Sequence, residues 1–246
     1  MSELGEPVSD EPEEQADEAE VADLVQRLKS LVDSRRPPAG PVAERWSLGV
    51  GDLLAEHPQV PKRLRGLVRR LDRFGGLAIT PDTIAFDGDD VDWSDVTGVR
   101  TRHVVDYLLG DAVQTQVERI PLPWFPGRRR LLDALGRAVL TVTIATAKDQ
   151  LDNRGLDLRI PAEIEYRGAF RRRKTLGAGV LGAVVLIDPA VRDCVTATAQ
   201  AKGIPVAAGE DDDLADAGQR AAALRVKIAA LETELARFSQ RFGKKT

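Results

Sequence analysis

Apolar side chains recur every three or four residues in two segments of the N-terminal third, the spacing of one face of an α-helix. The first segment spans residues 21–32, and a proline-rich stretch from Pro37 to Pro41 follows it as a linker. The second spans residues 60–74, with an apolar stripe surrounded by basic side chains. We therefore expect two amphipathic helices, the second strongly basic and ended by Gly75-Gly76.

The apolar pattern changes to alternation after residue 76. Leu77 with Ile79, residues 83–86, and Val91 with Trp93 each indicate a short strand. Asp87-Gly88 lies between the last two and favours a tight hairpin turn, because both residue types tolerate positive φ. The pattern predicts an antiparallel β-meander.

The next apolar segment, residues 131–147, fits two structures. Its first half has helical spacing, whereas Leu140, Val142 and Ile144 alternate with threonines as in a strand. Residues 160–166 favour another strand. Both possibilities for residues 131–147 stay open.

A strand–helix–strand order is predicted between residues 182 and 206. The continuous apolar run 182–187 is typical of a strand buried on both faces. Asp188-Pro189 then supplies an N-cap and a first helical residue, and Gly203 ends the helix before an extended piece at 204–206. This order indicates a short βαβ-like unit.

A final helix is predicted from residue 211 onward, with the acidic run 211–213 at its positive end. Its apolar positions step by four and three, the spacing of a coiled-coil seam. The seam consists of Leu224, Ile228, Leu231, Leu235, Phe238 and Phe242. It can pack against a second copy, a partner, or the helix at 21–32 of the same chain.

Composition and charge narrow the class of protein. The 246 residues are 43% hydrophobic and 30% charged, as in a globular protein, and they include one cysteine, Cys194, which excludes an internal disulfide. Residues 1–20 hold nine acidic and no basic side chains and few apolar ones, so we expect a disordered acidic tail. The N-terminus has no signal-peptide pattern and no apolar run is long enough to span a bilayer, which favours a cytoplasmic protein.

The stretch TIAFDGDDVDWSDVTGV, residues 83–99, carries a family resemblance. Together with Leu77 and Ile79 it resembles the start of bacterial pleckstrin-homology-like (PH-like) or GRAM-like domains. In those domains a strand bearing a Trp leads through a short polar turn into the next strand. The resemblance implies a small antiparallel β domain. The alanine- and arginine-rich composition is also similar to that of actinobacterial proteins.

The segment from Gly177 to Gly182 spells G-x-G-x-x-G, which suggests a phosphate-binding loop. A dinucleotide fingerprint needs an apolar strand before the first glycine and a helix at the last, but here arginines and a lysine precede it and the apolar run follows. The run 176–187 is also too short for a membrane span. We expect buried core here, and no cofactor.

Other catalytic or metal-binding patterns are weak. The five aspartates between Asp87 and Asp95 fit no calcium-loop register, and His57 and His103 have no Cys or His cluster around them. We therefore predict no catalytic, cofactor or metal residue. Basic side chains form three clusters that would bind anionic lipid or nucleic acid if the fold joined them. They are Lys62, Arg63, Arg65, Arg69, Arg70, Arg73, Arg128, Arg129, Arg130, Arg171, Arg172, Arg173 and Lys174.

The sequence thus predicts an α+β protein in five parts. They are a disordered tail (1–20), a helical lead-in with a proline-rich linker (21–75), an antiparallel PH-like β domain (76–147), an α/β segment (148–210) and a C-terminal coiled-coil-like helix (211–246). The leading hypothesis is a non-enzymatic binding or adaptor protein acting through protein contacts or self-association. The alternatives are a peripheral binder of anionic lipid or nucleic acid, and a nucleotide-dependent enzyme using the loop 177–182.

Overall fold

The computed structural model describes residues 11–55, 57–104, 107, 124, 126, 128–152 and 158–209, and also 222, 225, 226, 228–230, 232 and 233. Its helices are α1 (Glu11–Ser34), α2 (Val50–Ala55), α3 (Arg65–Val68), α6 (Arg128–Asp152), α7 (Val180–Val185) and α8 (Pro189–Ala201), with 3-10 turns η1 (Lys62–Leu64), η2 (Arg69–Phe74) and η3 (Ala169–Arg171). Its strands are β1 (Trp46–Gly49), β2 (Gly76–Ile79), β3 (Thr83–Phe86), β4 (Asp89–Asp92), β5 (Val96–His103), β6 (Arg159–Arg167), β7 (Arg173–Gly177) and β8 (Val206–Ala208). The predicted α+β class is confirmed.

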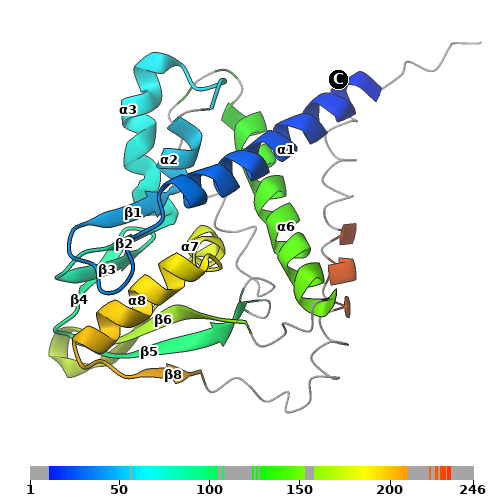
Figure 1. Cartoon of the computed structure of the whole chain (residues 1–246). Helices are drawn as coiled ribbons and strands as arrows, with labels where there is room; N and C mark the ends of the chain where they lie inside the picture. Colours follow the sequence, from blue (N-terminus) through cyan, green and yellow to red (C-terminus); the bar gives the residue numbers. More distant parts are fainter. Residues whose placement is uncertain are drawn as a thin grey trace, which may run out of the picture.

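The strands form two separate sheets. The first sheet has the order β1-β2-β3-β4 and is antiparallel throughout. The second has the order β7-β6-β5-β8, in which only β8 runs parallel to its neighbour β5. Helices α7 and α8 lie between the two sheets, and α1 and α6 pack against each other beside them (Figure 1).

The hairpin predicted at residues 83–93 is confirmed, although its second strand, β4, ends at Asp92, before Trp93. Asp87 and Gly88 both adopt positive φ, 53° and 88°, and join β3 to β4 in a two-residue turn. Trp93 is buried, and its indole N–H donates to the carbonyl oxygen of Thr80 at 3.0 Å. The next strand, β5, leaves this sheet and joins the second one, so the meander does not continue past Trp93.

The strand predicted at residues 182–187 is wrong, because these residues belong to the short helix α7 and the turn after it. A continuous apolar run fits a buried helix as well as a buried strand, and here all six residues of α7 are buried. Burial itself was predicted correctly: Val184, Val185 and Leu186 are buried and Ile187 is half-buried. Because the first strand is absent, the local βαβ-like unit is also wrong, and β8 pairs with β5 instead.

Two further segments differ from the sequence expectation. The ambiguous segment 131–147 lies entirely within helix α6. Thr143 is accommodated in this helix because its hydroxyl donates a hydrogen bond to the carbonyl oxygen of Val139. Antiparallel β structure therefore does not extend into these residues. In the N-terminal tail, α1 begins at Glu11, so residues 11–20 are helical and not disordered. Residues 1–10 lie outside the described residues.

The basic segment 60–74 is helical but not one continuous helix. It is divided into η1, α3 and η2, and Leu67, expected on the buried stripe, is 47% exposed. Val60, Val68 and Leu71 are buried as predicted. The division accompanies a very close approach to α2: a Cβ added to Gly51 would lie 2.6 Å from the backbone oxygens of Val68 and Arg69.

The predicted cap of α8 is confirmed and can be tested. The Asp188 carboxylate accepts hydrogen bonds from the backbone N–H groups of Ala190 and Val191, at 2.9 and 3.4 Å, and pairs with Arg36 at 3.1 Å.

We expect Asp188→Ala to lower the free energy of unfolding by about 1–2 kcal/mol, measured by urea denaturation. Asp193→Ala, at an exposed position of the same helix, is the control and should change it by less than about 0.5 kcal/mol. An equal effect of both variants would contradict the capping role.

Candidate functional site

A groove crosses the face of the first sheet that points away from the core. Strand register places Ser47, Ala78, Ala85 and Asp90 in one row across β1, β2, β3 and β4. The neighbouring row Leu48, Leu77 and Phe86 is buried, because successive side chains of a strand point to opposite faces. The small side chains of the first row leave a hollow with a volume of about 360 Å³.

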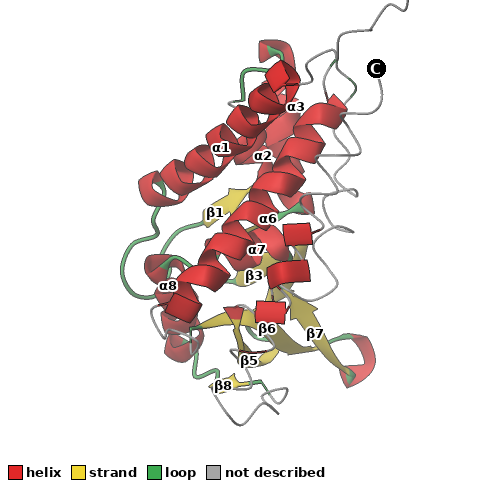
Figure 2. Cartoon of the chain, turned by 90° about the vertical axis from the view of Figure 1, so that its right-hand side faces the viewer, coloured by secondary structure: helices red, strands yellow, loops and turns green. Residues whose placement is uncertain are grey.

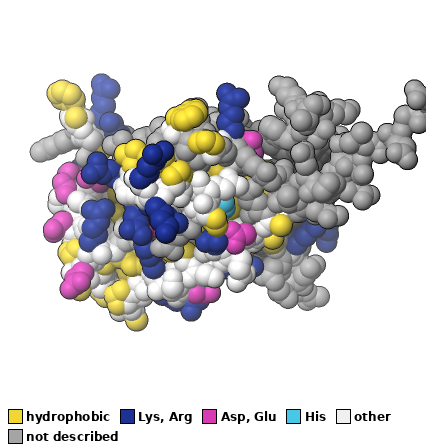
Figure 3. Space-filling model, turned by 90° about the horizontal axis from the view of Figure 1, so that it is seen from above, with side chains coloured by type: hydrophobic (Ala, Val, Ile, Leu, Met, Phe, Trp, Pro, Cys, Tyr) yellow, Lys and Arg dark blue, Asp and Glu magenta, His cyan; other side chains and the backbone are white. Residues whose placement is uncertain are grey.

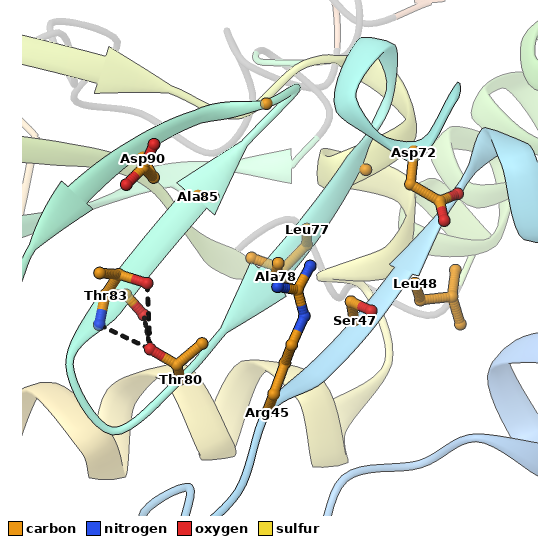
Figure 4. A pocket seen from close by; sticks show the side chains of 12 residues that line it. Arg45, Ser47, Leu48, Asp72, Leu77, Ala78, Thr80, Thr83, Ala85 and Asp90 are labelled. Carbon is orange, nitrogen blue, oxygen red and sulfur yellow. Dashed lines mark hydrogen bonds between the residues drawn. The ribbon is translucent and has the colours of Figure 1, made fainter. Parts of the chain in front are cut away.

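The rim of this groove carries opposite charges at its two edges. Arg45 precedes β1, and in Figure 4 its side chain extends beside Ala78 and Ser47. Asp90 lies on β4 at the other edge and is exposed. Within the described part of the chain, the Arg45 side chain makes neither a hydrogen bond nor an ion pair. The groove therefore presents a cation at one edge and a carboxylate at the other.

The turn between β2 and β3 forms a third part of the rim. The Thr80 hydroxyl accepts hydrogen bonds from the backbone N–H groups of Asp82 and Thr83, at 3.1 and 2.7 Å, and lies 3.0 Å from the Thr83 hydroxyl (Figure 4). These bonds hold the turn in one conformation. The two threonines therefore serve the turn itself, with no free nucleophile among them.

Asp72 lines the groove from η2 and has an unusual ionisation. Burial and the negative charge of Asp52 raise its pKa from 3.8 to about 6, against the lowering effect of the N–H groups of Asp52 and Gly51 and the charge of Arg35. The Asp52 N–H donates to Asp72 Oδ1 at 3.0 Å, and the Asp52 carboxylate pairs with Arg35 at 2.8 Å. These contacts tie η2 to the start of α2, so the role of Asp72 is structural.

The fold does not join the predicted basic clusters into one surface. Lys62, Arg63, Arg69 and Arg70 are exposed around α3, and Arg65 is half-buried. Figure 2 shows α3 near the top of the molecule and β7, which follows the exposed Arg172, near the bottom. Figure 3 views the molecule from above, and in this view Lys and Arg side chains gather on the left part of the surface with hydrophobic side chains beside them. Arg129 is exposed, and the side chains of Arg73, Arg128, Arg130 and Arg171 lie outside the described residues.

One residue of the predicted C-terminal seam is described, and it packs against its own chain. Ile228 is 5% exposed and belongs to the main hydrophobic core. Nearby, Glu232 pairs with Lys148 of α6 at 2.6 Å. The other seam residues, Leu224, Leu231, Leu235, Phe238 and Phe242, lie outside the described residues. At Ile228 the helix docks intramolecularly.

The glycine segment 177–182 lies between β7 and α7, so the order of elements is strand, loop and helix, contrary to the sequence argument. Other features speak against phosphate binding there. The Ala178 N–H donates to the Ala162 carbonyl at 2.7 Å, and the Tyr107 hydroxyl donates to the Ala178 carbonyl at 2.6 Å. Gly179 and Val180 are buried, and α7 is only six residues long.

Groups able to hold a metal or act as nucleophiles are scarce in the described chain. Among those residues no three His, Cys, Asp or Glu side chains are grouped as metal ligands require. His57 and His103 are buried, and burial raises the pKa of the Cys194 thiol, which leaves it unreactive at neutral pH. No helix in the described ranges is both long and apolar enough to cross a bilayer.

The fold is that of a mixed α+β protein with a groove on the outer face of its first sheet. No protein-family model matches the chain, and comparisons with curated proteins and with solved structures give no significant match either.

Sequence reasoning missed the groove. The alternation of Ala78 and Ala85 with large apolar residues was visible, and it shows that the outward face of the hairpin carries only small side chains. The contribution of Arg45 and Ser47 was not visible, because nothing in residues 45–49 predicts that this strand pairs with β2.

The raised pKa of Asp72 predicts a pH effect on stability. A carboxyl group whose folded-state pKa is above its unfolded value stabilises the fold fully below the unfolded pKa, about 4, and this contribution is lost as the pH rises through about 6. Asp72→Asn keeps an oxygen acceptor but removes the ionisation. We expect the free energy of unfolding of the variant to rise relative to wild type between pH 4 and 7, measured by urea denaturation at each pH. Asp82→Asn, at an exposed position, is the control. If the difference in the free energy of unfolding between Asp72→Asn and wild type stays constant with pH, the prediction is contradicted.

Proposed function

We propose that the protein is a non-enzymatic binding or adaptor protein that holds a short segment of a partner protein in the groove on the first sheet. The observation that carries the proposal is the row Ser47, Ala78 and Ala85, whose small side chains open the groove beside Arg45, which has no ion-pair partner among the described residues. A sheet face covered by large residues would leave no room for a ligand. The lining residues spread over all four strands of the sheet, which suits an extended peptide better than a small metabolite.

The charges at the two edges define the kind of segment that fits. Arg45 favours an acidic side chain or carboxylate, whereas Asp90 favours a basic one. The distance across four strands is about 15 Å, since neighbouring strands lie about 4.8 Å apart. A segment of about five extended residues, acidic at one end and basic at the other, satisfies both charges.

An adaptor role also agrees with the rest of the described chain. The buried histidines and thiol, the structural tasks of Asp72 and the two threonines, and the hydrogen-bonded loop at Ala178 leave no assembled catalytic set among the described residues. We further propose a cytoplasmic location. The PH-like or GRAM-like resemblance of residues 77–99 stays part of the proposal, supported by the hairpin with its buried Trp93.

The proposed groove can be tested by photo-crosslinking in cells that make the protein. A small diazirine amino acid at Ala85 should form one discrete covalent adduct with the partner, and the same side chain at exposed Ala201 on α8 should not. Arg45→Glu should reduce the adduct at position 85 by at least about tenfold, because it places like charges together. Circular dichroism checks that the variants are folded.

Two results would contradict the proposal. One is the absence of an adduct at position 85 under conditions in which other surface positions react. The other is an adduct whose yield is the same with Arg45 and with Arg45→Glu.

A further inference from the structure

The hairpin that joins β6 to β7 carries an exposed aromatic side chain at its tip. Phe170, in η3, is 95% exposed, and Figure 2 shows this tip projecting from the lower right of the molecule. No aromatic residue of the core is comparable: Phe86 and Trp93 are 1% and 3% exposed. A phenylalanine that contacts almost nothing contributes nothing to folding by burial.

The backbone at Phe170 is also unfavourable for its residue type. Its φ of 62° and ψ of 25° lie in the left-handed region, which glycine or asparagine normally occupies. Positions that keep a strained conformation are frequently functional. The hairpin has a large apolar residue at a position where a glycine would fit the backbone better.

Basic side chains surround this tip. Arg167, Arg172, Arg173 and Lys174 are all exposed. None of these four side chains forms an ion pair or a hydrogen bond with the described residues, whereas on β5 of the same sheet Arg100 and Arg102 pair with Glu165 and Glu163.

Two of these cations face each other directly. Arg167 and Arg173 are opposite each other in the β6–β7 ladder, so their side chains leave the sheet on the same face. Like charges at directly opposite positions destabilise a hairpin. The Gly168 N–H donates to the Arg172 carbonyl at 2.9 Å and the Arg167 N–H to the Asp95 carbonyl at 3.0 Å, so the backbone holds this arrangement in place.

We propose that the β6–β7 hairpin tip binds the surface of an anionic lipid bilayer, with the Phe170 ring inserted at the level of the headgroups and the four basic side chains on the lipid phosphates and carboxylates. This partner satisfies both unfavourable features, because it takes the ring out of water and neutralises the facing arginines. A nucleic acid would satisfy the charges, but stacking sites for bases combine several aromatic side chains along a groove. The tip has one.

The strength expected of this contact is modest. Each basic side chain near an anionic surface strengthens partitioning by about fivefold, and burial of one Phe ring adds at least about tenfold. Multiplied together, these factors give a reversible attachment whose strength is of the same order as the membrane partitioning of a single acyl chain. The hairpin tip contributes no residue to the lining of the groove on the first sheet, so this inference does not depend on the proposed function.

The test is co-sedimentation of the full chain with phosphatidylcholine vesicles with and without about 30 mol% phosphatidylserine. We expect binding only to the anionic vesicles and weaker binding at high salt. Phe170→Ala should weaken it by about tenfold, and replacement of Arg172, Arg173 and Lys174 by Gln should weaken it by about a hundredfold. The matched control replaces exposed Lys62, Arg63 and Arg70 by Gln, which removes the same charge at the other end of the molecule and should have little effect.

A second measurement separates membrane contact from a role in folding. Phe170→Gly should raise the melting temperature, because glycine relieves the left-handed backbone, and still lose vesicle binding. Phe170→Trp should show an indole emission blue-shift, relative to wild type, on adding anionic vesicles. Three results would each overturn the proposal. The first is an equal loss of vesicle binding in the two triple-Gln variants, and the second is a melting temperature lowered by Phe170→Gly. The third is binding of the protein to DNA but not to vesicles.

Discussion

The backbone contact made by three glycines holds the first sheet, α2 and η2 together, and the groove depends on it. A Cβ at Gly51 would lie 2.6 Å from two backbone oxygens of the basic segment, a Cβ at Gly76 would lie 2.7 Å from the Cα atom of Gly49, and a Cβ at Gly49 would meet Asp72. No side chain larger than hydrogen fits at these positions without a backbone shift. The approach brings Asp72 against the first turn of α2 and fixes where β1 meets β2.

The core and the two proposed binding surfaces follow from how the sheets are covered. Helix α7 packs on the inner face of the first sheet, where a Cβ added to Gly182 would lie 3.7 Å from the Phe86 ring, and α8 packs on the second sheet. The outer face of the first sheet keeps only small side chains and so stays open. The β6–β7 hairpin extends beyond the layers and places its tip in solvent. One surface is thus built by strand register and the other by a projecting turn.

The local features of the fold followed from the sequence, whereas long-range pairings did not. Asp87-Gly88, Asp188-Pro189 and Gly203 act on their immediate neighbours, and the structure has the predicted hairpin turn, helix cap and helix end at these residues. The run 182–187 was misassigned because the period of apolar residues alone does not separate a buried helix from a buried strand. The pairing of β5 with β6 and β8, and of β1 with β2, joins segments that carry no mutual signal in one sequence. Both candidate surfaces depend on such pairings, and Phe170 stands out only once its exposure and φ are known.

The most direct test of this account compares two glycines of the same region. Gly51 faces backbone oxygens at 2.6 Å, whereas a Cβ added to Gly66, in α3, meets no atom within 4 Å. In urea denaturation, Gly51→Ala should lower the free energy of unfolding by at least about 2 kcal/mol because the packed backbones must separate. Gly66→Ala should raise it by about 0.5–1 kcal/mol through helix propensity. A Gly51→Ala variant as stable as Gly66→Ala would contradict the contact on which the groove depends.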